Sequence, residues 1–129
     1  MELPNYAYFK GNIVPYSEAK VGVLTHALNY GTAVFGGMRA YWNANEEQLY
    51  LFRPLDHFRR FLSSASLLLM DFEHTPESLT QVCIDLLRKE GQRCDVYLRP
   101  LAYKADEAIG VKLHGLQNEI SIVAIPFGL

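Results

Sequence analysis

The sequence predicts one domain with two main helices in the middle of the chain and strands before and after them. Segments of the first half and of the last third alternate polar and apolar side chains with the period of a strand, whereas residues 54–91 carry apolar side chains at helical spacing. The 129 residues suffice to bury a hydrophobic core. No internal repeat, low-complexity segment or linker interrupts them, so we expect a single domain over residues 1–129.

Two short segments near the start predict a β-hairpin. Residues 6–9 and residues 12–16 flank Lys10 and Gly11, a pair that suits a tight turn. This hairpin is the first pair of strands that we expect.

The chain is organised around residues 25–42, THALNYGTAVFGGMRAYW. Thr25 can cap a helix and Gly31 can terminate one, so the first half predicts one or two helical turns. The second half is rich in residues that favour strands. Its alternation places Phe35, Gly37, Arg39 and Tyr41 on one face, and Val34, Gly36, Met38, Ala40 and Trp42 on the other. The second face can pack on a core, and we expect the first face, with its arginine between aromatic rings, to hold a ligand.

The middle of the chain continues with a strand and two helices. Residues 48–53 alternate well enough to pair with the strand before them. Pro54 then opens a helix, because proline is tolerated in a first turn. Its predicted core stripe is Leu55, Phe58, Leu62, Ala65 and Leu69, and Arg60 lies nearly opposite this stripe, with His57 one turn before it and Ser64 one turn after. A second helix runs from a Thr75 cap to Gly91, with an apolar stripe of Leu79, Val82, Cys83, Leu86 and Leu87.

Two more strands close the domain. Residues 95–104 place Tyr97, Arg99, Leu101 and Tyr103 on one face, and Val96, Leu98 and Ala102 on the other. Pro100 lacks a backbone donor, which predicts that this strand lies at an edge or is bulged there. After an irregular loop, residues 119–126 (EISIVAIP) form a short apolar run that is typical of a strand covered on both faces.

Composition excludes several functions. Twelve basic and fourteen acidic residues give a net charge of −2, which argues against a nucleic-acid partner. The amino-terminal residues lack a signal peptide and no apolar run could span a membrane, so we expect a cytoplasmic protein. The two cysteines predict free thiols, and the four histidines show no metal-ligand spacing. The five lysines lie in turns, at a helix end or in a loop, and none is expected in an apolar pocket that would lower its pKa.

Three arginines are the candidate binding residues. Arg39 and Arg99 each have a tyrosine two positions away on the same strand face, and Arg60 has a serine one helical turn on. An anionic ligand, such as a carboxylate or a phosphate, would complete these sites. The alternative is that the arginines pair with acids elsewhere or extend into water. Spacing alone favours this alternative.

Four motifs together resemble a known family. They are LTHALNYGTAVFGGMRAYW, LYLFRPLDHFRRFLSSASLL, VYLRPLAYKADEAIGV and SIVAIPFG, and they cover nearly the whole chain. In this order and spacing they resemble the amino-terminal small domain of the branched-chain amino-acid aminotransferases, which are fold-type IV (class IV) pyridoxal-phosphate enzymes. The resemblance implies an α+β domain with an antiparallel or mixed sheet, which packs on a larger carboxy-terminal domain with pyridoxal 5'-phosphate between them.

The resemblance also implies roles for individual residues. Arg60 matches the arginine that binds the cofactor phosphate. Phe35, Gly37 and Arg39 match residues that line the substrate pocket, and Tyr97 and Arg99 match those that bind substrate carboxylates. Tyr30 matches a tyrosine that the family contributes to the pocket of the neighbouring subunit, which implies a homodimer. The implied reaction moves an amino group between leucine, isoleucine or valine and 2-oxoglutarate, with an amino acid and a 2-oxo acid as small-molecule partners.

Two departures limit what the resemblance implies. Many relatives carry Glu where this chain has Gly36, which affects the expected substrate preference. The Schiff-base lysine of the family lies in the carboxy-terminal domain, so no catalytic residue is expected within this chain, and we expect the chain alone to be inactive. The alternatives within the fold type are a D-amino-acid aminotransferase and an aminodeoxychorismate lyase. A non-catalytic binding module is the alternative from another class.

Overall fold

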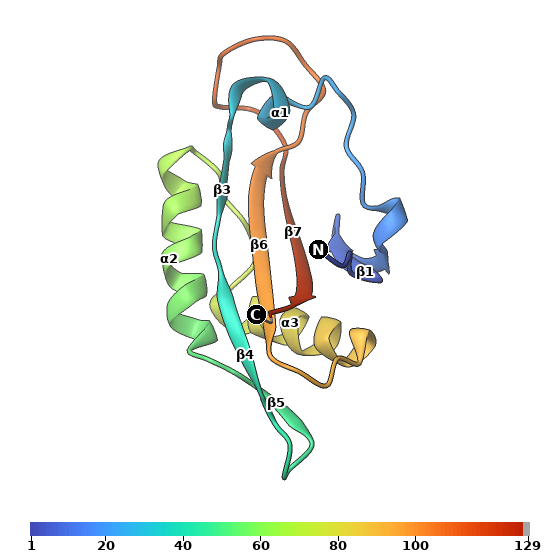
Figure 1. Cartoon of the computed structure of the whole chain (residues 1–129). Coiled ribbons are helices and arrows are strands. Elements are labelled where there is room, and N and C mark those ends of the chain that lie inside the picture. The colour runs from blue at the N-terminus through green and yellow to red at the C-terminus, as the bar shows by residue number, and fades with distance from the viewer. Residues whose placement is uncertain (128–129) are drawn as a thin grey trace.

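The computed structural model describes residues 1–127 and folds them into one layer of strands and one of helices (Figure 1). In chain order the elements are β1 (Tyr6–Phe9), β2 (Asn12–Pro15), the 3-10 helix η1 (Tyr16–Glu18), α1 (His26–Tyr30), β3 (Ala33–Phe35), β4 (Met38–Asn43), β5 (Gln48–Leu51), α2 (Pro54–Leu67), α3 (Pro76–Glu90), β6 (Val96–Lys104) and β7 (Asn118–Pro126). The predicted hairpin, the short helix before Gly31, both main helices and the last two strands are therefore confirmed.

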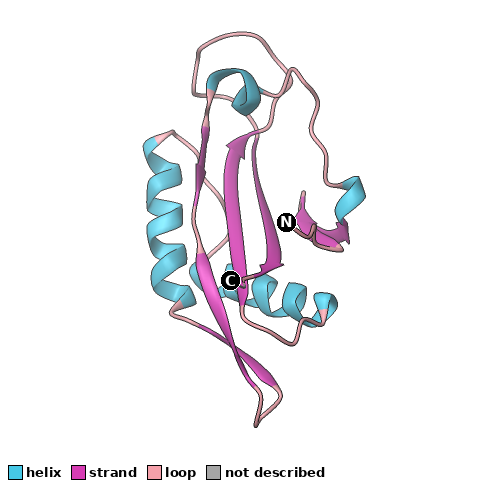
Figure 2. Cartoon of the chain, viewed as in Figure 1, coloured by secondary structure: helices cyan, strands magenta, loops and turns pink. Residues whose placement is uncertain are grey.

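Within residues 1–127, seven strands form one sheet with the order β2-β1-β7-β6-β4-β5, in which β3 also pairs with β6. Every strand pair within residues 1–127 is antiparallel. The two longest strands, β6 and β7, lie side by side at the centre (Figure 2). This arrangement confirms the α+β class and shows that the sheet is antiparallel rather than mixed.

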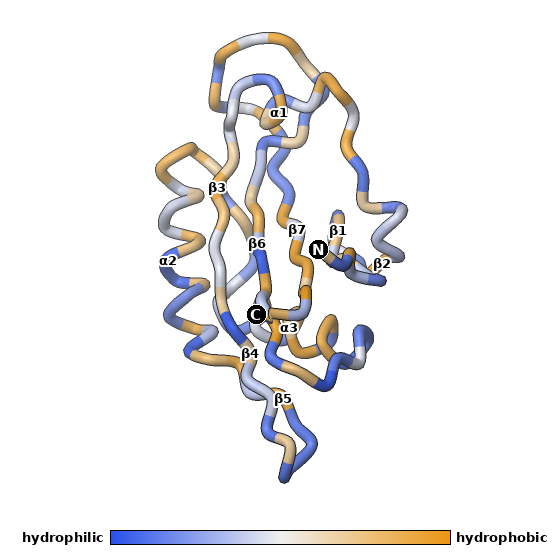
Figure 3. Tube along the Cα trace, in the orientation of Figure 1, coloured by the Kyte–Doolittle hydropathy of each residue, from blue (hydrophilic) through white to orange (hydrophobic). Residues whose placement is uncertain are grey.

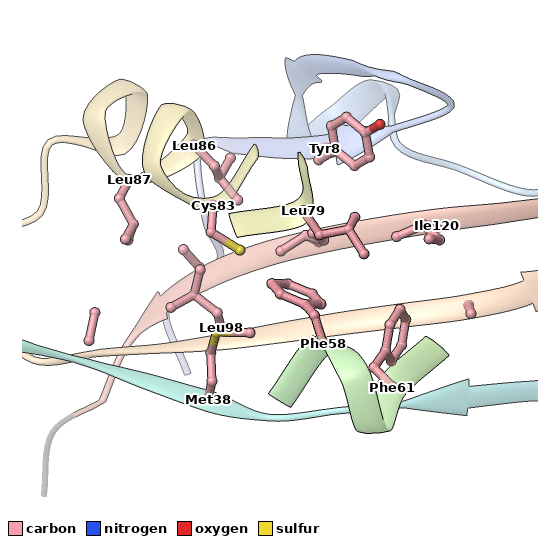
Figure 4. Close-up of a cluster of buried hydrophobic side chains, with 14 of the residues drawn as sticks. Tyr8, Met38, Phe58, Phe61, Leu79, Cys83, Leu86, Leu87, Leu98 and Ile120 are labelled. Carbon is pink, nitrogen blue, oxygen red and sulfur yellow. The ribbon is translucent and has the colours of Figure 1, made fainter. Parts of the chain in front are cut away.

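Helices α2 and α3 cover one face of the sheet, and in Figure 1 α3 passes behind β6 and β7 while α2 stands at the left, beside β3. Phe58 and Phe61 of α2 meet Leu79 of α3 over Leu98 and neighbouring strand residues, and these side chains form the buried core (Figure 4). The two rings of α2 pack edge to face, with centroids 6.1 Å apart. Burial of these large apolar side chains is the main term that stabilises the layer packing.

The ends of α3 are fixed by the residues that the sequence indicated. The Thr75 hydroxyl accepts a hydrogen bond from the Ser78 amide at 3.0 Å, and the Ser78 hydroxyl accepts one from the Thr75 amide at 2.9 Å. This reciprocal capping box satisfies two amides at the start of the helix. Gly91 ends the helix in the left-handed conformation at φ 67°, which costs glycine little.

The predicted core stripe of α2 was partly wrong. Phe61 is 3% exposed and belongs to the core, whereas Leu69 is 57% exposed and lies beyond the end of the helix. The physical reason is that α2 packs both on the sheet and on α3, so a wider sector of its surface is buried than one stripe provides.

The open face of the sheet corrects the expectation for β7. Its residues Ile120, Ile122 and Ala124 are buried beneath the helices, but the residues between them are only half-buried. Within residues 1–127 the helices therefore cover one face of the strand, and its other face lies on the open side of the sheet that β6, β4 and β3 share.

Pro100 lies at the centre of the sheet, which corrects the prediction of an edge or bulge. The β3 and β4 pairings with β6 keep one register across the position, from Phe35 opposite Leu101 to Met38 opposite Leu98. The backbone nitrogen of Pro100, which carries no hydrogen, faces the break between β3 and β4. There the Gly36 amide donates to the Pro100 carbonyl at 2.9 Å. A central proline is tolerated here because the ladder is already interrupted at Gly36 and Gly37.

Candidate functional site

Arg39 and Tyr97 lie directly opposite each other on the neighbouring strands β4 and β6. Opposed residues of paired strands project to the same side of a sheet, so both belong to the open face. Arg99 is the next residue but one along β6 and joins them there. Its Nε donates to the Tyr97 hydroxyl at 3.2 Å, and its guanidinium lies 4.2 Å from the centre of the Phe35 ring. The structure thus brings together four of the residues that the sequence indicated.

Aromatic rings support both guanidinium groups. Arg39 lies 4.4 Å from the ring centre of Phe127, and this ring stacks on Tyr97 with centroids 5.9 Å apart. Within residues 1–127 neither Arg39 nor Arg99 forms an ion pair. The alternative that they pair with acids of the chain is therefore wrong for the described part. Cation–π contacts hold the cations in place and leave their donors available to an anion.

Phe127 is a member of this cluster that sequence reasoning missed. Its amide donates to the Asp95 carbonyl at 2.9 Å, which continues the antiparallel pairing just beyond the end of β7. The signal was present in the sequence, because the period of two that runs through Val123 and Ile125 places Phe127 on the same face.

Gly37 leaves room for the tyrosine of the cluster. A Cβ atom at this position would lie 2.9 Å from Cε2 and Cζ of Tyr97 and still closer to its hydroxyl oxygen. Any larger residue would therefore displace the ring. Gly37 is adjacent to the cluster for this steric reason, and it supplies no side chain of its own.

Arg60 lies on α2 beside the break between β3 and β4. Its neighbours Arg53 and Arg59 both pair with Asp56, with N–O distances of 2.7 and 3.1 Å, whereas Arg60 makes no ion pair within residues 1–127. The arginine and His57 together line two hollows. One is a cavity of about 330 Å³ that Asp56 also lines, and the other is a narrow space of about 30 Å³ against Gly36 and Gly37.

The electrostatics of this second site suit an anion. Burial lowers the pKa of His57, and the nearby cations Arg60 and Arg53 lower it further, while Asp56 acts in the opposite direction. The imidazole is therefore held in its neutral form, in which it can still donate one hydrogen bond. With Ser64 one helical turn on, a guanidinium, an imidazole and a hydroxyl line the same narrow space.

Tyr30 lies apart from both groups. It is the last residue of α1, and its hydroxyl accepts a hydrogen bond from the Gly110 amide at 2.9 Å. No contact joins it to Arg39, Tyr97 or Arg60 within residues 1–127, so this chain does not bring Tyr30 into the pocket formed by the other predicted site residues.

Lys104 corrects the expectation that the chain buries no lysine. Its side chain is 0% exposed, on the helix-covered face at the end of β6, and its Nζ has the Leu69 carbonyl as its acceptor at 3.5 Å. Burial lowers the pKa of this amine. Because Arg39 and Tyr97 lie on the opposite face of the sheet, Lys104 is not part of their site.

Residues 1–127 contain no group of three His, Cys, Asp or Glu side chains that is suited to a metal ion. The helices of this part of the chain are too short or too polar to cross a membrane.

Comparison with known proteins finds clear relatives, although no family model matches the chain. A protein of Aquifex aeolicus (strain VF5) named "Probable branched-chain-amino-acid aminotransferase" is 43% identical over 124 residues, which are 96% of this chain and 40% of that protein. The structure of a branched-chain aminotransferase from Thermoproteus uzoniensis with norvaline matches with a TM-score of 0.90 and 42% identity, over 97% of this chain and 41% of that chain.

A third match is a structure with its cofactor. The branched-chain amino acid aminotransferase from Thermobaculum terrenum in its PLP-form (holo-form) matches with a TM-score of 0.87 and 36% identity, over 98% of this chain and 41% of that chain. The chain thus spans about 40% of the length of the relatives that it matches, and nearly all of its own length takes part in each match.

Proposed function

We propose that this chain, which has the sequence and fold of one segment of the branched-chain aminotransferases, is the amino-terminal small domain of such an enzyme. Matches that cover about 96% of the chain but only 40% of a relative support this reading. The proposal places the cofactor lysine and the larger domain outside residues 1–129, and the last two of these residues lie outside the described part. The chain's own carboxy-terminal domain is then its first partner.

The proposed reaction of the whole enzyme moves an amino group between a branched-chain amino acid and 2-oxoglutarate. The names of the relatives favour this reaction over the D-amino-acid aminotransferase and aminodeoxychorismate lyase alternatives. Pyridoxal 5'-phosphate, when bound, supplies an electron sink for the substrate. The residues of this chain would hold and orient both molecules. The cytoplasmic location expected from the sequence stays a prediction.

The observation that carries the proposal is the free guanidinium of Arg60 beside two hollows. Among three neighbouring arginines on or next to α2, it alone has no ion pair within residues 1–127. We assign it to the cofactor phosphate, because guanidinium donors match phosphate oxygens in a bidentate manner. A phosphate oxygen could also reach the hydroxyl of Ser64, which lines the same narrow space.

The open-face cluster is proposed as the carboxylate site. Arg99 and Tyr97 would bind substrate carboxylates, and Arg39 would hold the tyrosine through Phe127, on which it lies. The Phe35 ring would meet an apolar substrate side chain. One wall can serve both substrate types because aromatic rings and a guanidinium alternate on it. Tyr30 would act in the pocket of a neighbouring subunit, which requires a homodimer.

A titration of this chain with pyridoxamine 5'-phosphate tests the phosphate assignment. The ligand is followed by ³¹P NMR with wild type, Arg60→Ala and the matched control Arg59→Ala. We expect Arg60→Ala to weaken binding by about 10-fold or more, the usual cost of losing a charge-assisted hydrogen bond, and Arg59→Ala to change it by less than about threefold. Equal losses in both variants would show a general charge effect and overturn the assignment.

A further inference from the structure

His26 opens the short helix α1 and is 1% exposed. Both of its ring nitrogens have partners. Nδ1 lies 2.8 Å from the Thr32 hydroxyl, and Nε2 lies 2.7 Å from the Gly110 carbonyl oxygen. A carbonyl oxygen can only accept, so Nε2 carries the proton in this contact. In the neutral ring, Nδ1 then accepts from the Thr32 hydroxyl.

Gly110 is held from two sides. Its carbonyl accepts from His26, and its amide donates to the Tyr30 hydroxyl at 2.9 Å. His26 and Tyr30 are four positions apart on α1, so they lie on one face of the helix, and their ring centroids are 4.6 Å apart. Gly110 has a φ of 149°, which glycine adopts readily.

Backbone contacts bring the loop to this point. The His26 amide donates to the Asp106 carbonyl at 2.8 Å, and the Ala108 amide donates to the Leu24 carbonyl at 3.1 Å. These bonds hold the start of the loop that connects β6 with β7. Between Ala108 and Gln117, the hydrogen bonds that the described structure gives to the loop are the two at Gly110, and Gln117 itself bonds back to Ala105 and Asp106.

The residues on either side of Gly110 expose apolar side chains. Ile109 is 70% exposed and Val111 is 81% exposed. The loop passes over α1 at the top of Figure 3, where orange segments mark its hydrophobic residues. Its backbone is anchored while its apolar side chains point away from the core. Such an arrangement presents those side chains in a fixed position and does not bury them.

We infer that His26 is a positioning residue, which sets the place of Gly110 and through it the places of Tyr30, Ile109 and Val111. Any effect of this positioning on substrate binding rests on the proposed role of Tyr30, but the positioning itself does not. A histidine suits the task because one ring joins two partners that lie on opposite sides of it. Thr32 fixes the orientation of the ring, and the ring fixes Gly110.

A pair of variants separates the two contacts of the ring. His26→Gln keeps an amide donor near the place of Nε2, and His26→Asn keeps a polar group near the place of Nδ1. We expect amide exchange at Gly110 to become roughly tenfold faster in His26→Asn, and to stay within about threefold of wild type in His26→Gln. Thr32→Val, which removes the partner of Nδ1, should give an intermediate increase.

Two readouts would overturn the inference. One is equal exchange at Gly110 in both His26 variants, or faster exchange throughout the domain. Either result would mean that His26 stabilises the domain in general and does not position Gly110. The other is a ¹⁵N spectrum of wild type in which the neutral imidazole carries its proton on Nδ1. The pyridoxamine 5'-phosphate titration separates this inference from the proposed function. His26→Asn should bind this ligand as wild type does, because Arg60 lies on another element.

Discussion

The ring of Tyr97 lies so close to Gly37 that the absence of a side chain at Gly37 determines where the tyrosine can be. A Cβ at this position would fall 2.9 Å from two ring carbons. Real side chains do not approach this closely, so the ring and a larger residue exclude each other. The hydroxyl of the same tyrosine accepts from Arg99, and its ring stacks on Phe127. One glycine thereby fixes the geometry of the proposed carboxylate site.

Replacing Gly37 with alanine should displace Tyr97 at a cost of about 1 kcal/mol or less, because the clash is with the end of a half-buried side chain that can rotate away on the open face. The hydrogen bond from Arg99 should be lost with the movement of the ring. Urea unfolding measures the stability, and the NMR signals of the Tyr97 ring report its position.

Gly36→Ala is the matched control for this experiment, because its Cβ would lie 3.3 Å from Pro100 and 3.6 Å from Phe61. This contact is tight and its two neighbours are buried, so we expect a comparable loss of stability but an unmoved Tyr97. An unchanged Tyr97 signal in Gly37→Ala would contradict the steric argument.

The sequence predicted which face each strand residue occupies but not which strands are neighbours. Alternation alone placed Arg39 on one face of its strand and Tyr97 on one face of another. That these faces coincide depends on the pairing of β4 with β6, which joins residues far apart in the chain. Helical periodicity likewise placed Arg60 away from the core, but it could not show that Asp56 pairs with the other two arginines.

Lys104 shows how residue type can mislead where periodicity is correct. It continues the buried face of β6 after Leu98, Pro100 and Ala102, so a period of two predicts its burial. A lysine is rarely buried without a partner, and this prior favoured an exposed position. The helices nevertheless cover the end of β6, and the amine of Lys104 has the carbonyl of Leu69 as its hydrogen-bond acceptor.

Lys104→Met should stabilise the protein at pH 7 by about 1–2 kcal/mol, because it replaces a poorly compensated buried amine with an apolar chain of similar length. Burial lowers the pKa of Lys104 below its ordinary value of 10.5. The unfolded state therefore binds more protons at this group between the two pKa values, and the stability of wild type should rise relative to the variant as pH increases toward 10.5.

Chemical unfolding of both proteins from about pH 7 to 10 measures this difference. Lys112→Met is the control, because Lys112 is exposed. We expect no comparable change for it. A Lys104→Met variant less stable than wild type at every pH would show that the amine stabilises the fold.

The buried hydroxyl of Tyr103 should produce the opposite pH dependence. The residue is 4% exposed, and its hydroxyl has no hydrogen-bond partner within residues 1–127. Burial raises its pKa to about 12, and Glu119 acts in the same direction. The raised pKa favours the neutral form in the folded state, so this contribution to stability is complete below the ordinary value of 10 and is lost as the pH rises toward 12.

Tyr103→Phe removes this titration, and at pH 7 it should change stability by less than about 1 kcal/mol, because no hydrogen bond is lost. Between about pH 9 and 11 wild type should lose stability relative to the variant. Urea unfolding at these pH values measures the difference. A constant difference would mean that the hydroxyl reaches water or a partner in solution.

Incubation of this chain with pyridoxal 5'-phosphate should leave no lysine stoichiometrically modified after borohydride reduction. Lys104 is buried on the helix-covered face, and Lys10, Lys20, Lys89 and Lys112 are exposed on the surface, where a cofactor aldehyde reacts slowly and without preference. None of the five lies in the cluster of Arg39 and Tyr97. Peptide mapping by mass spectrometry should therefore find partial labels spread over the exposed lysines, and the chain alone should not transaminate leucine. One lysine labelled to a full equivalent, and protected by pyridoxamine 5'-phosphate, would place the missing catalytic amine within this chain.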